Sequence, residues 1–355
     1  MSGDMNLEQR VRQSFIDQAA ICGKLGSSFM ETLLTGLAEV LDESTKTGAR
    51  ILKWQGDPAP EKDALALRLA GALHALVRRG DIPALLPFYR GEKQIEKSEF
   101  IALVLQAIVE RDAEISPWLD FAPQTNEVAR SSVIFAGLSE LSARYKLPMA
   151  LYELGSSGGL NLQTAEYGYR FAGNIYGNAE STLQLTPDWE GPLPPQSAPQ
   201  IFSRRGCDLN PLSVDEPADR EKLVAYLWPD QPARIKRVEN AIEIARKDPP
   251  IIDRADAASW VEKNFSEPGE NDILRVLFHT IAWNYFPEET KNRITTAMNA
   301  AGRDATEKCP LAWLSCEFEE ETRPALTVQT WPGGEVHVLG VADPHVYGIK
   351  WFGYG

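Results

Sequence analysis

The sequence predicts an α/β protein in which an all-α region precedes a doubly wound, mostly parallel sheet that ends in an antiparallel hairpin. Apolar residues at helical spacing dominate the first third of the chain, and beyond Lys146 apolar strands alternate with amphipathic helices. Two late β runs flank the turn at 332–334. We therefore expect a helical N-terminal cap region at 1–122 and a Rossmann-like α/β domain at 123–355, with an irregular insertion at 167–199.

The helices of the first region follow from apolar spacing and from capping signals. Ser28 and Glu31 form a capping box in front of an apolar helix. A leucine-rich helix stops at Gly80, directly after two arginines, which is a C-terminal signal. The helices expected before Lys146, where strands begin to alternate with helices, are 7–22, 28–41, 61–79, 99–111 and 127–145.

The strands of the second region are short apolar runs, and polar amphipathic segments separate them. The expected strands are 148–154, 200–207, 251–252, 273–279, 311–318, 326–331 and 335–341. The expected helices between them are 219–228, 231–247, 257–264 and 288–301.

The composition and charge of the chain argue against several classes of function. Hydrophobic residues make up 43% of the chain and charged residues 24%, as in a soluble globular protein. A formal net charge of −14 argues against a direct grip on nucleic acid. The start of the chain lacks the apolar core of a secretory signal, and no apolar run is long enough to span a membrane, so we expect a cytoplasmic protein. Its oligomeric state stays open.

The four cysteines form no C-x-x-C pair and the four histidines lack metal-ligand spacing, so we expect reduced thiols and no metal site.

The most informative segment is a glycine-rich turn after the strand at 148–154. Glycines let the backbone approach a ligand, and the helix expected from Leu160 would offer free N–H groups. The pattern acidic-x-Gly-x-x-x-Gly is typical of S-adenosylmethionine-dependent methyltransferases, although the usual middle glycine is a serine here. A merely tight turn is the alternative. The residues that we assign to cofactor binding are Glu153, Gly155, Ser156, Ser157, Gly159 and Asn161.

The ends of the next two strands carry carboxylates that complete a nucleoside site. Ligands of open α/β sheets lie beyond the carboxyl ends of the strands. Asp208 is therefore a candidate for binding both ribose hydroxyls, or alternatively for capping the turn before Asn210-Pro211. Asp256 is a candidate for the adenine amino group, or alternatively the N-cap of the helix at 257–264.

The fourth strand ends at His279, which is a candidate general base because its ordinary pKa lies near 6.5. A structural role is the alternative. Trp283 and Tyr285 follow and are candidates for a substrate wall, with a core position as the alternative for Trp283.

Before the sheet, polar residues crowd the string 124–130. We interpret Gln124, Asn126, Glu127 and Arg130 as residues of the substrate pocket, with an N-cap by Thr125 or by Asn126 as the alternative.

Several long strings resemble the bacterial family called domain of unknown function 2332. They are AGALHALVRRGDIPAL, PQTNEVARS, LYELGSSGGLNLQTAEYGYRF, RRGCDLNP, LWPDQPARI, FHTIAWNYF and WPGGE. The family usually shows E-x-G-x-S-x-G-L-N-L at the turn, which this chain keeps, and a terminal D-P-H-G pattern, which is shifted here because Val346 follows His345. The resemblance implies a methyltransferase-like α/β domain behind a helical region, and it implies no substrate.

The sequence thus predicts an S-adenosylmethionine-dependent methyltransferase that acts on a small molecule by in-line displacement. A non-catalytic ligand- or protein-binding module that retains the fold is the alternative. A nicotinamide or flavin enzyme is a third possibility, and the acidic residue before the glycine turn speaks against it because a pyrophosphate would lie there.

Overall fold

A computed structural model describes residues 6–318 and 323–354. The chain folds into two compact units. We call the first the helical unit, which comprises the described residues up to Thr125 together with Pro217–Lys236. We call the second the sheet unit, which comprises Asn126–Glu216 and the described residues from Arg237 onward.

The helical unit consists of helices whose ends match local sequence signals. Gly80 ends one helix with φ of 82°, a left-handed conformation that favours glycine. The second helix begins at Ser28 as expected, but its N-cap is Ser27 rather than Ser28, because Ser27 Oγ accepts the hydrogen bond from Met30 N. The elements are α1 (Leu7–Lys24), α2 (Ser28–Val40), α3 (Lys46–Leu52), α4 (Leu65–Arg79), α5 (Leu86–Tyr89), α6 (Lys97–Glu110), α7 (Asp112–Ile115), η1 (Ser116–Asp120) and α9 (Pro217–Ala225).

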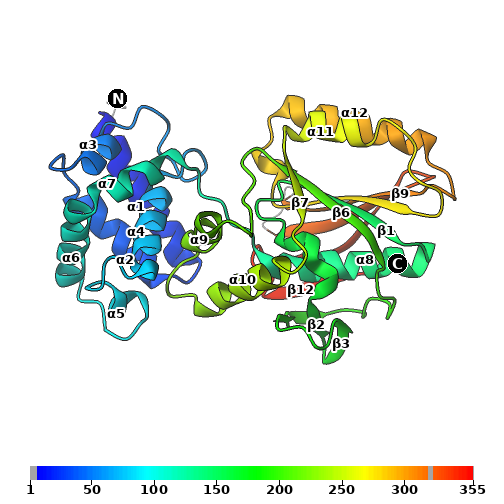
Figure 1. Cartoon of the computed structure of the whole chain (residues 1–355), viewed down its shortest axis with the longest axis horizontal. Coiled ribbons are helices and arrows are strands. Elements are labelled where there is room, and N and C mark those ends of the chain that lie inside the picture. The colour runs from blue at the N-terminus through cyan, green and yellow to red at the C-terminus, as the bar shows by residue number, and fades with distance from the viewer. Residues whose placement is uncertain (1–5, 319–322, 355) are drawn as a thin grey trace. The chain divides into compact units, whose positions relative to one another are not determined.

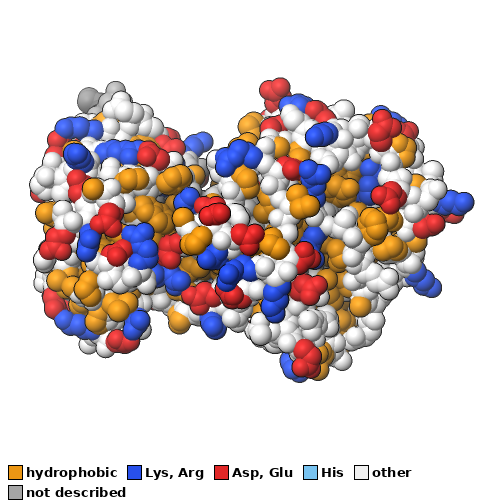
Figure 2. Space-filling view, viewed as in Figure 1, with side chains coloured by type: hydrophobic (Ala, Val, Ile, Leu, Met, Phe, Trp, Pro, Cys, Tyr) orange, Lys and Arg blue, Asp and Glu red, His pale blue; other side chains and the backbone are white. Residues whose placement is uncertain are grey.

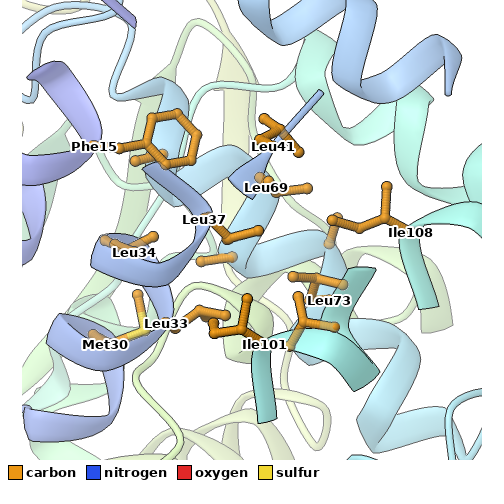
Figure 3. Close-up of a cluster of buried hydrophobic side chains, with 14 of the residues drawn as sticks. Phe15, Met30, Leu33, Leu34, Leu37, Leu41, Leu69, Leu73, Ile101 and Ile108 are labelled. Carbon is orange, nitrogen blue, oxygen red and sulfur yellow. The ribbon is translucent and has the colours of Figure 1, made fainter. Parts of the chain in front are cut away.

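The core of the helical unit is a cluster of buried leucine, isoleucine and phenylalanine side chains from α1, α2, α4 and α6 (Figure 3). The labelled members are Phe15, Met30, Leu33, Leu34, Leu37, Leu41, Leu69, Leu73, Ile101 and Ile108.

A late segment of the chain belongs to this unit, although it lies within the range expected for the α/β domain. Trp228 packs into the cluster of α1, α2, α4 and α6. The Asp230 carboxylate accepts hydrogen bonds from Ser27 Oγ at 2.7 Å and from Phe29 N at 3.2 Å, and so it caps α2. Residues 217–236 therefore complete the helical unit from a distant part of the sequence.

The sheet unit is built on a nine-stranded sheet in the order β5-β12-β11-β10-β9-β8-β1-β6-β7. The strands β7, β6, β1, β8 and β9 pair in parallel, and β9, β10, β11 and β12 pair antiparallel. The expected mixed α/β class with a large, mostly parallel sheet and a helical N-terminal region is confirmed. The strands are β1 (Met149–Leu154), β5 (Asp188–Glu190), β6 (Ile201–Asp208), β7 (Ile251–Arg254), β8 (Leu274–Thr280), β9 (Leu311–Phe318), β10 (Pro324–Trp331), β11 (Glu335–Ala342) and β12 (Gly348–Trp351).

Helices cover both faces of this sheet (Figure 1). On one face, α11 and α12 pack on a core that includes Leu154, Leu277 and Trp260. On the other face, α8 packs on β9 and β10, where Gly137 lets Leu314 and Leu326 approach the helix. The helical elements of the sheet unit are η2 (Val128–Arg130), α8 (Ser131–Tyr145), η3 (Leu160–Glu166), α11 (Ala257–Asn264), η4 (Trp283–Tyr285) and α12 (Glu288–Asp304), and α10 (Pro232–Ala245) spans the boundary at residue 236.

The insertion at 167–199 is ordered into strands that the sequence analysis did not place. Its first part forms a small sheet of β2 (Gly168–Phe171), β3 (Asn174–Gly177) and β4 (Gln184–Leu185). Its later strand β5 pairs in parallel with β12 at the edge of the large sheet.

The order of the parallel strands creates a switch point between β1 and β8. From β1 the chain moves outward to β6 and β7, and it then returns to the other side of β1 with β8 and β9. Connections that leave adjacent strands in opposite directions open a crevice beyond their carboxyl ends. Any candidate site is therefore sought beyond Leu154 and Thr280.

No helix within residues 6–318 and 323–354 is long and apolar enough to cross a membrane. On the face that Figure 2 shows, Lys and Arg side chains are interspersed with Asp and Glu side chains. All four cysteines are free and buried.

Candidate functional site

The glycine turn after β1 is shaped by three residues in the left-handed region. Gly155 and Gly159 both have φ of 66°, and Ser157 has φ of 52°. A Cβ at position 159 would lie 2.7 Å from Pro250 Cγ, and one at 155 would lie 2.9 Å from Ala282 Cβ. Both glycines are therefore required by close packing as well as by conformation.

The backbone N–H groups of this turn bond within the protein. Ser156 N donates to Cys207 O at 3.0 Å and Gly159 N donates to Ser156 O at 2.7 Å. Leu160 N donates to Asn126 Oδ1 at 2.9 Å. The segment that follows is the 3-10 helix η3 rather than an α-helix. The expectation of free N–H groups at a helix start is therefore wrong for these donors, because the protein itself supplies their acceptors.

Asp208 holds the turn from the neighbouring strand. Its Oδ2 accepts from Ser157 N at 2.9 Å and its Oδ1 accepts from Asn210 N at 2.8 Å. The turn-capping alternative is thus realised. The ribose contact stays a prediction, since each carboxylate oxygen has a second lone pair.

Glu153 is a buried carboxyl at the end of β1, with 2% of its surface exposed. Its Oε2 has no hydrogen-bond partner among the described residues. Burial, helped by the charge of Asp208, raises the pKa of Glu153 well above its usual range, and hydrogen bonds with Asn161 and Ser156 oppose that rise. Asn161 is itself oriented by Ser131, whose Oγ donates to Asn161 Oδ1 at 2.8 Å.

His279 at the end of β8 pairs with Glu317 near the end of β9. His279 Nδ1 lies 2.7 Å from Glu317 Oε1, which also accepts from Ala282 N at 2.9 Å. Both side chains are buried, and His279 Nε2 has no partner among the residues described. A carboxylate that accepts from Nδ1 leaves the Nε2 lone pair of a neutral imidazole available, as in a general base.

Aromatic rings and a strained turn fix this pair. Trp283 stacks on the His279 ring with centroids 5.0 Å apart and planes at 15°, and Trp313 lies at 5.9 Å. Ile281 has φ of 47°, which is uncommon for a β-branched residue. Tyr285 is 76% exposed. Trp283 therefore contacts the histidine directly, whereas Tyr285 lies on the surface.

Arg130, from the polar string 124–130 before the sheet, contacts the end of β8. Arg130 Nη1 donates to Thr280 O at 3.2 Å, and its Nε donates to Pro344 O at 3.2 Å. Burial lowers the pKa of Arg130, and the charges of Glu127 and Glu317, among others, oppose that shift. Arg130 thus connects the end of β8 to the loop before β12.

Glu127 contacts Arg237 and His345. Together with Arg130, His279 and Glu317, these residues form what we call the cluster. Glu127 Oε1 accepts from Arg237 Nη1 at 3.1 Å and from Ala129 N at 3.1 Å. Its Oε2 lies 3.5 Å from His345 Nδ1. The N-cap of η2 is Glu127, so the alternative in which Thr125 or Asn126 is the cap is wrong.

The remaining candidates lie apart from this cluster. Asp256 is the N-cap of α11, with Oδ1 accepting from Ser259 N at 2.9 Å, so that alternative is realised and the adenine contact stays a prediction. Gln124 belongs to the helical unit. No group of three His, Cys, Asp or Glu residues that could hold a metal ion occurs in the described parts of the chain.

Sequence reasoning missed three members of the cluster, namely Glu317, His345 and Arg237. Glu317 had a usable signal, because it is an acidic residue near the end of an otherwise apolar strand. His345 and Arg237 had none, because their contacts with Glu127 depend on the folding of distant segments.

A sequence profile of the bacterial family domain of unknown function 2332, described as "uncharacterized protein conserved in bacteria", matches residues 12–351. The chain belongs to this family. The matched range includes every residue of this cluster, from Glu127 to His345. No curated protein and no solved structure matches the chain.

The raised pKa of Glu153 predicts a pH-dependent stability. Above the ordinary glutamate pKa the folded protein keeps a proton that the unfolded chain has released, so the free energy of unfolding falls as pH rises, by up to about 1.4 kcal/mol per pH unit. Glu153→Gln removes this contribution. Urea unfolding between about pH 5 and pH 8 should show a flatter slope for this variant. The exposed control Glu180→Gln should keep the wild-type slope, and equal slopes for Glu153→Gln and wild type would contradict the assignment.

The pairing of His279 with Glu317 predicts one tautomer. In the neutral ring the proton should reside on Nδ1, because the carboxylate accepts there. Nitrogen-15 NMR of the neutral side chain should therefore show Nε2 as the unprotonated nitrogen, with the partly exposed His337 as the comparison. A proton on Nε2 would mean that Glu317 donates and that His279 is no base.

Proposed function

We propose that this chain is an S-adenosylmethionine-dependent methyltransferase that acts on a small molecule. The observation that carries the proposal is the buried His279–Glu317 pair beside the switch point of the sheet. Strands β7, β6, β1, β8 and β9 have the order of a Rossmann-like sheet, in which a ligand lies beyond the carboxyl ends of β1 and β8. His279 is the last residue but one of β8 and so lies near that end of the sheet.

Two features of the β1 side suit the methionine part of the cofactor. The unpartnered Glu153 Oε2 is a buried acceptor that an ammonium group would satisfy. Gly155 is the one exposed residue of the turn 155–159, so a ligand can reach the backbone there. Binding would depend mainly on side chains, with Asp208 at the ribose and Asp256 at the adenine, since backbone donors of the turn are engaged.

When bound, S-adenosylmethionine supplies an activated methyl group, so the protein has mainly to position an acceptor and remove its proton. In this proposal, His279 Nε2 takes a proton from an oxygen or nitrogen acceptor. Glu317 holds the imidazole in the required tautomer and stabilises the imidazolium that forms. Trp283 stacks on the ring and keeps it in place, and water is excluded from it.

A second candidate is a non-catalytic binding module that retains the fold. The hydrogen bonds inside the turn favour it, because Ser156, Ser157, Gly159 and Leu160 donate their N–H groups to protein acceptors. Such a turn serves as a rigid scaffold whether or not a ligand binds. The two candidates differ in whether a methyl group is transferred.

Calorimetric titration with S-adenosylmethionine and S-adenosylhomocysteine, with NADH as a control, tests the proposal. We expect micromolar binding of the first two and a loss of about tenfold or more in Asp208→Asn, which keeps the shape but removes the charge. Asp17→Asn, at an exposed position of α1, is the matched control and should bind as wild type. No binding of either ligand would refute the proposal. Binding without transfer of labelled methyl to any compound of a bacterial metabolite extract would favour the module.

A further inference from the structure

A pocket lies at the amino ends of β1, β6 and β8, at the end of the strands opposite to the candidate site. Its volume is about 260 Å³. Ala150 and Tyr152 of β1 and Arg275 of β8 line it from the sheet, and Phe202 of β6 is a 56% exposed wall. The end of α11 and the loop 266–270 form the other side.

Arg275 is the unusual member of this pocket. Only 6% of its surface is exposed, and its Nη1 donates to Glu267 O at 3.0 Å. Its buried Nε has no hydrogen-bond partner among the described residues. The guanidinium forms no ion pair with a carboxylate in those parts of the chain. Phe265 lies under the guanidinium with its centroid at 5.2 Å. Burial without a counter-ion is costly for a guanidinium, and an anion would offset that cost.

The loop beside Arg275 holds the guanidinium in place. A Cβ at Gly269 would lie 2.7 Å from Arg275 Nε, so the backbone packs directly on the side chain. Cys309 Sγ lies 3.3 Å from Gly269 O and 3.1 Å from Asn271 Oδ1, so its single S–H group can donate to either acceptor of the loop. The cation is thus fixed before any ligand arrives.

We propose that this pocket binds a small carboxylate with an aromatic or apolar body. The planar guanidinium matches a carboxylate, and Tyr152, Ala150 and Phe202 offer apolar surface to the remainder of the ligand. Glu267 and Glu270 lie at the pocket and disfavour a doubly charged anion such as phosphate. The site is separate from the cluster at the carboxyl ends of the strands, and it does not depend on the methyltransferase proposal.

Calorimetric titration of the full chain with benzoate, in parallel with inorganic phosphate, tests this site. We expect benzoate to bind and Arg275→Gln to weaken it by about tenfold or more, since a charge-assisted pair is lost. Phe202→Ala removes only an exposed wall and should weaken benzoate by about fivefold. Lys24→Gln, an exposed lysine of α1 outside this pocket, is the matched control and should change affinity by less than about threefold.

The melting temperature separates a ligand site from a structural role of Arg275. If Arg275 binds the carboxylate, benzoate raises the melting temperature of the wild type and of Lys24→Gln but not that of Arg275→Gln. Absence of benzoate binding to the wild type, equal binding by Phe202→Ala and wild type, or tighter binding of phosphate than of benzoate would each overturn the proposal.

Discussion

The side chain of Arg130 joins two segments of the sheet unit at the strand ends. One guanidinium bonds the last carbonyl of β8, through Thr280 O, and a carbonyl of the loop before β12, through Pro344 O. Burial of such a group costs free energy, which its hydrogen bonds and the nearby charges of Glu127 and Glu317 offset. Both carboxylates also contact a histidine, since Glu127 Oε2 lies 3.5 Å from His345 Nδ1 and Glu317 Oε1 lies 2.7 Å from His279 Nδ1.

The polar groups at the strand ends are of two kinds, those bonded within the protein and those buried without a partner among the described residues. Donors of the glycine turn and both oxygens of Asp208 bond within the protein, so the turn fixes backbone geometry. Glu153 Oε2 and His279 Nε2 are instead buried and unpartnered among the described residues. Buried polar atoms without partners are rare in folded proteins and call for an explanation, which a ligand between the ends of β1 and β8 would supply.

Much of the fold could be predicted from local patterns. The apolar runs of β1, β8 and β9 and the helix α11 follow from residues next to one another, and the structure has them within a residue or two of the expected ends. Tertiary pairing could not be predicted. The Asp230 cap on α2 joins residues 203 positions apart, and β5 pairs with β12 across most of the second half of the chain.

The candidate site, like the fold, could be predicted from the sequence only in part. Crowded polar residues at 126–130 and a histidine at a strand end were visible in the sequence, because both are unusual in their local setting. Glu317 became the partner of His279 only through the register of β8 and β9, in which Thr280 lies opposite Cys316. A register is a property of the folded sheet, so no local pattern reveals the pair.

A crystal structure of the protein grown with S-adenosylhomocysteine tests the central claim most directly. We expect the ligand to lie beyond the carboxyl ends of β1 and β8, with its amino group at Glu153 and its sulfur near His279. Density for the ligand at another edge of the sheet, or at this edge but without contact to Glu153, would contradict it.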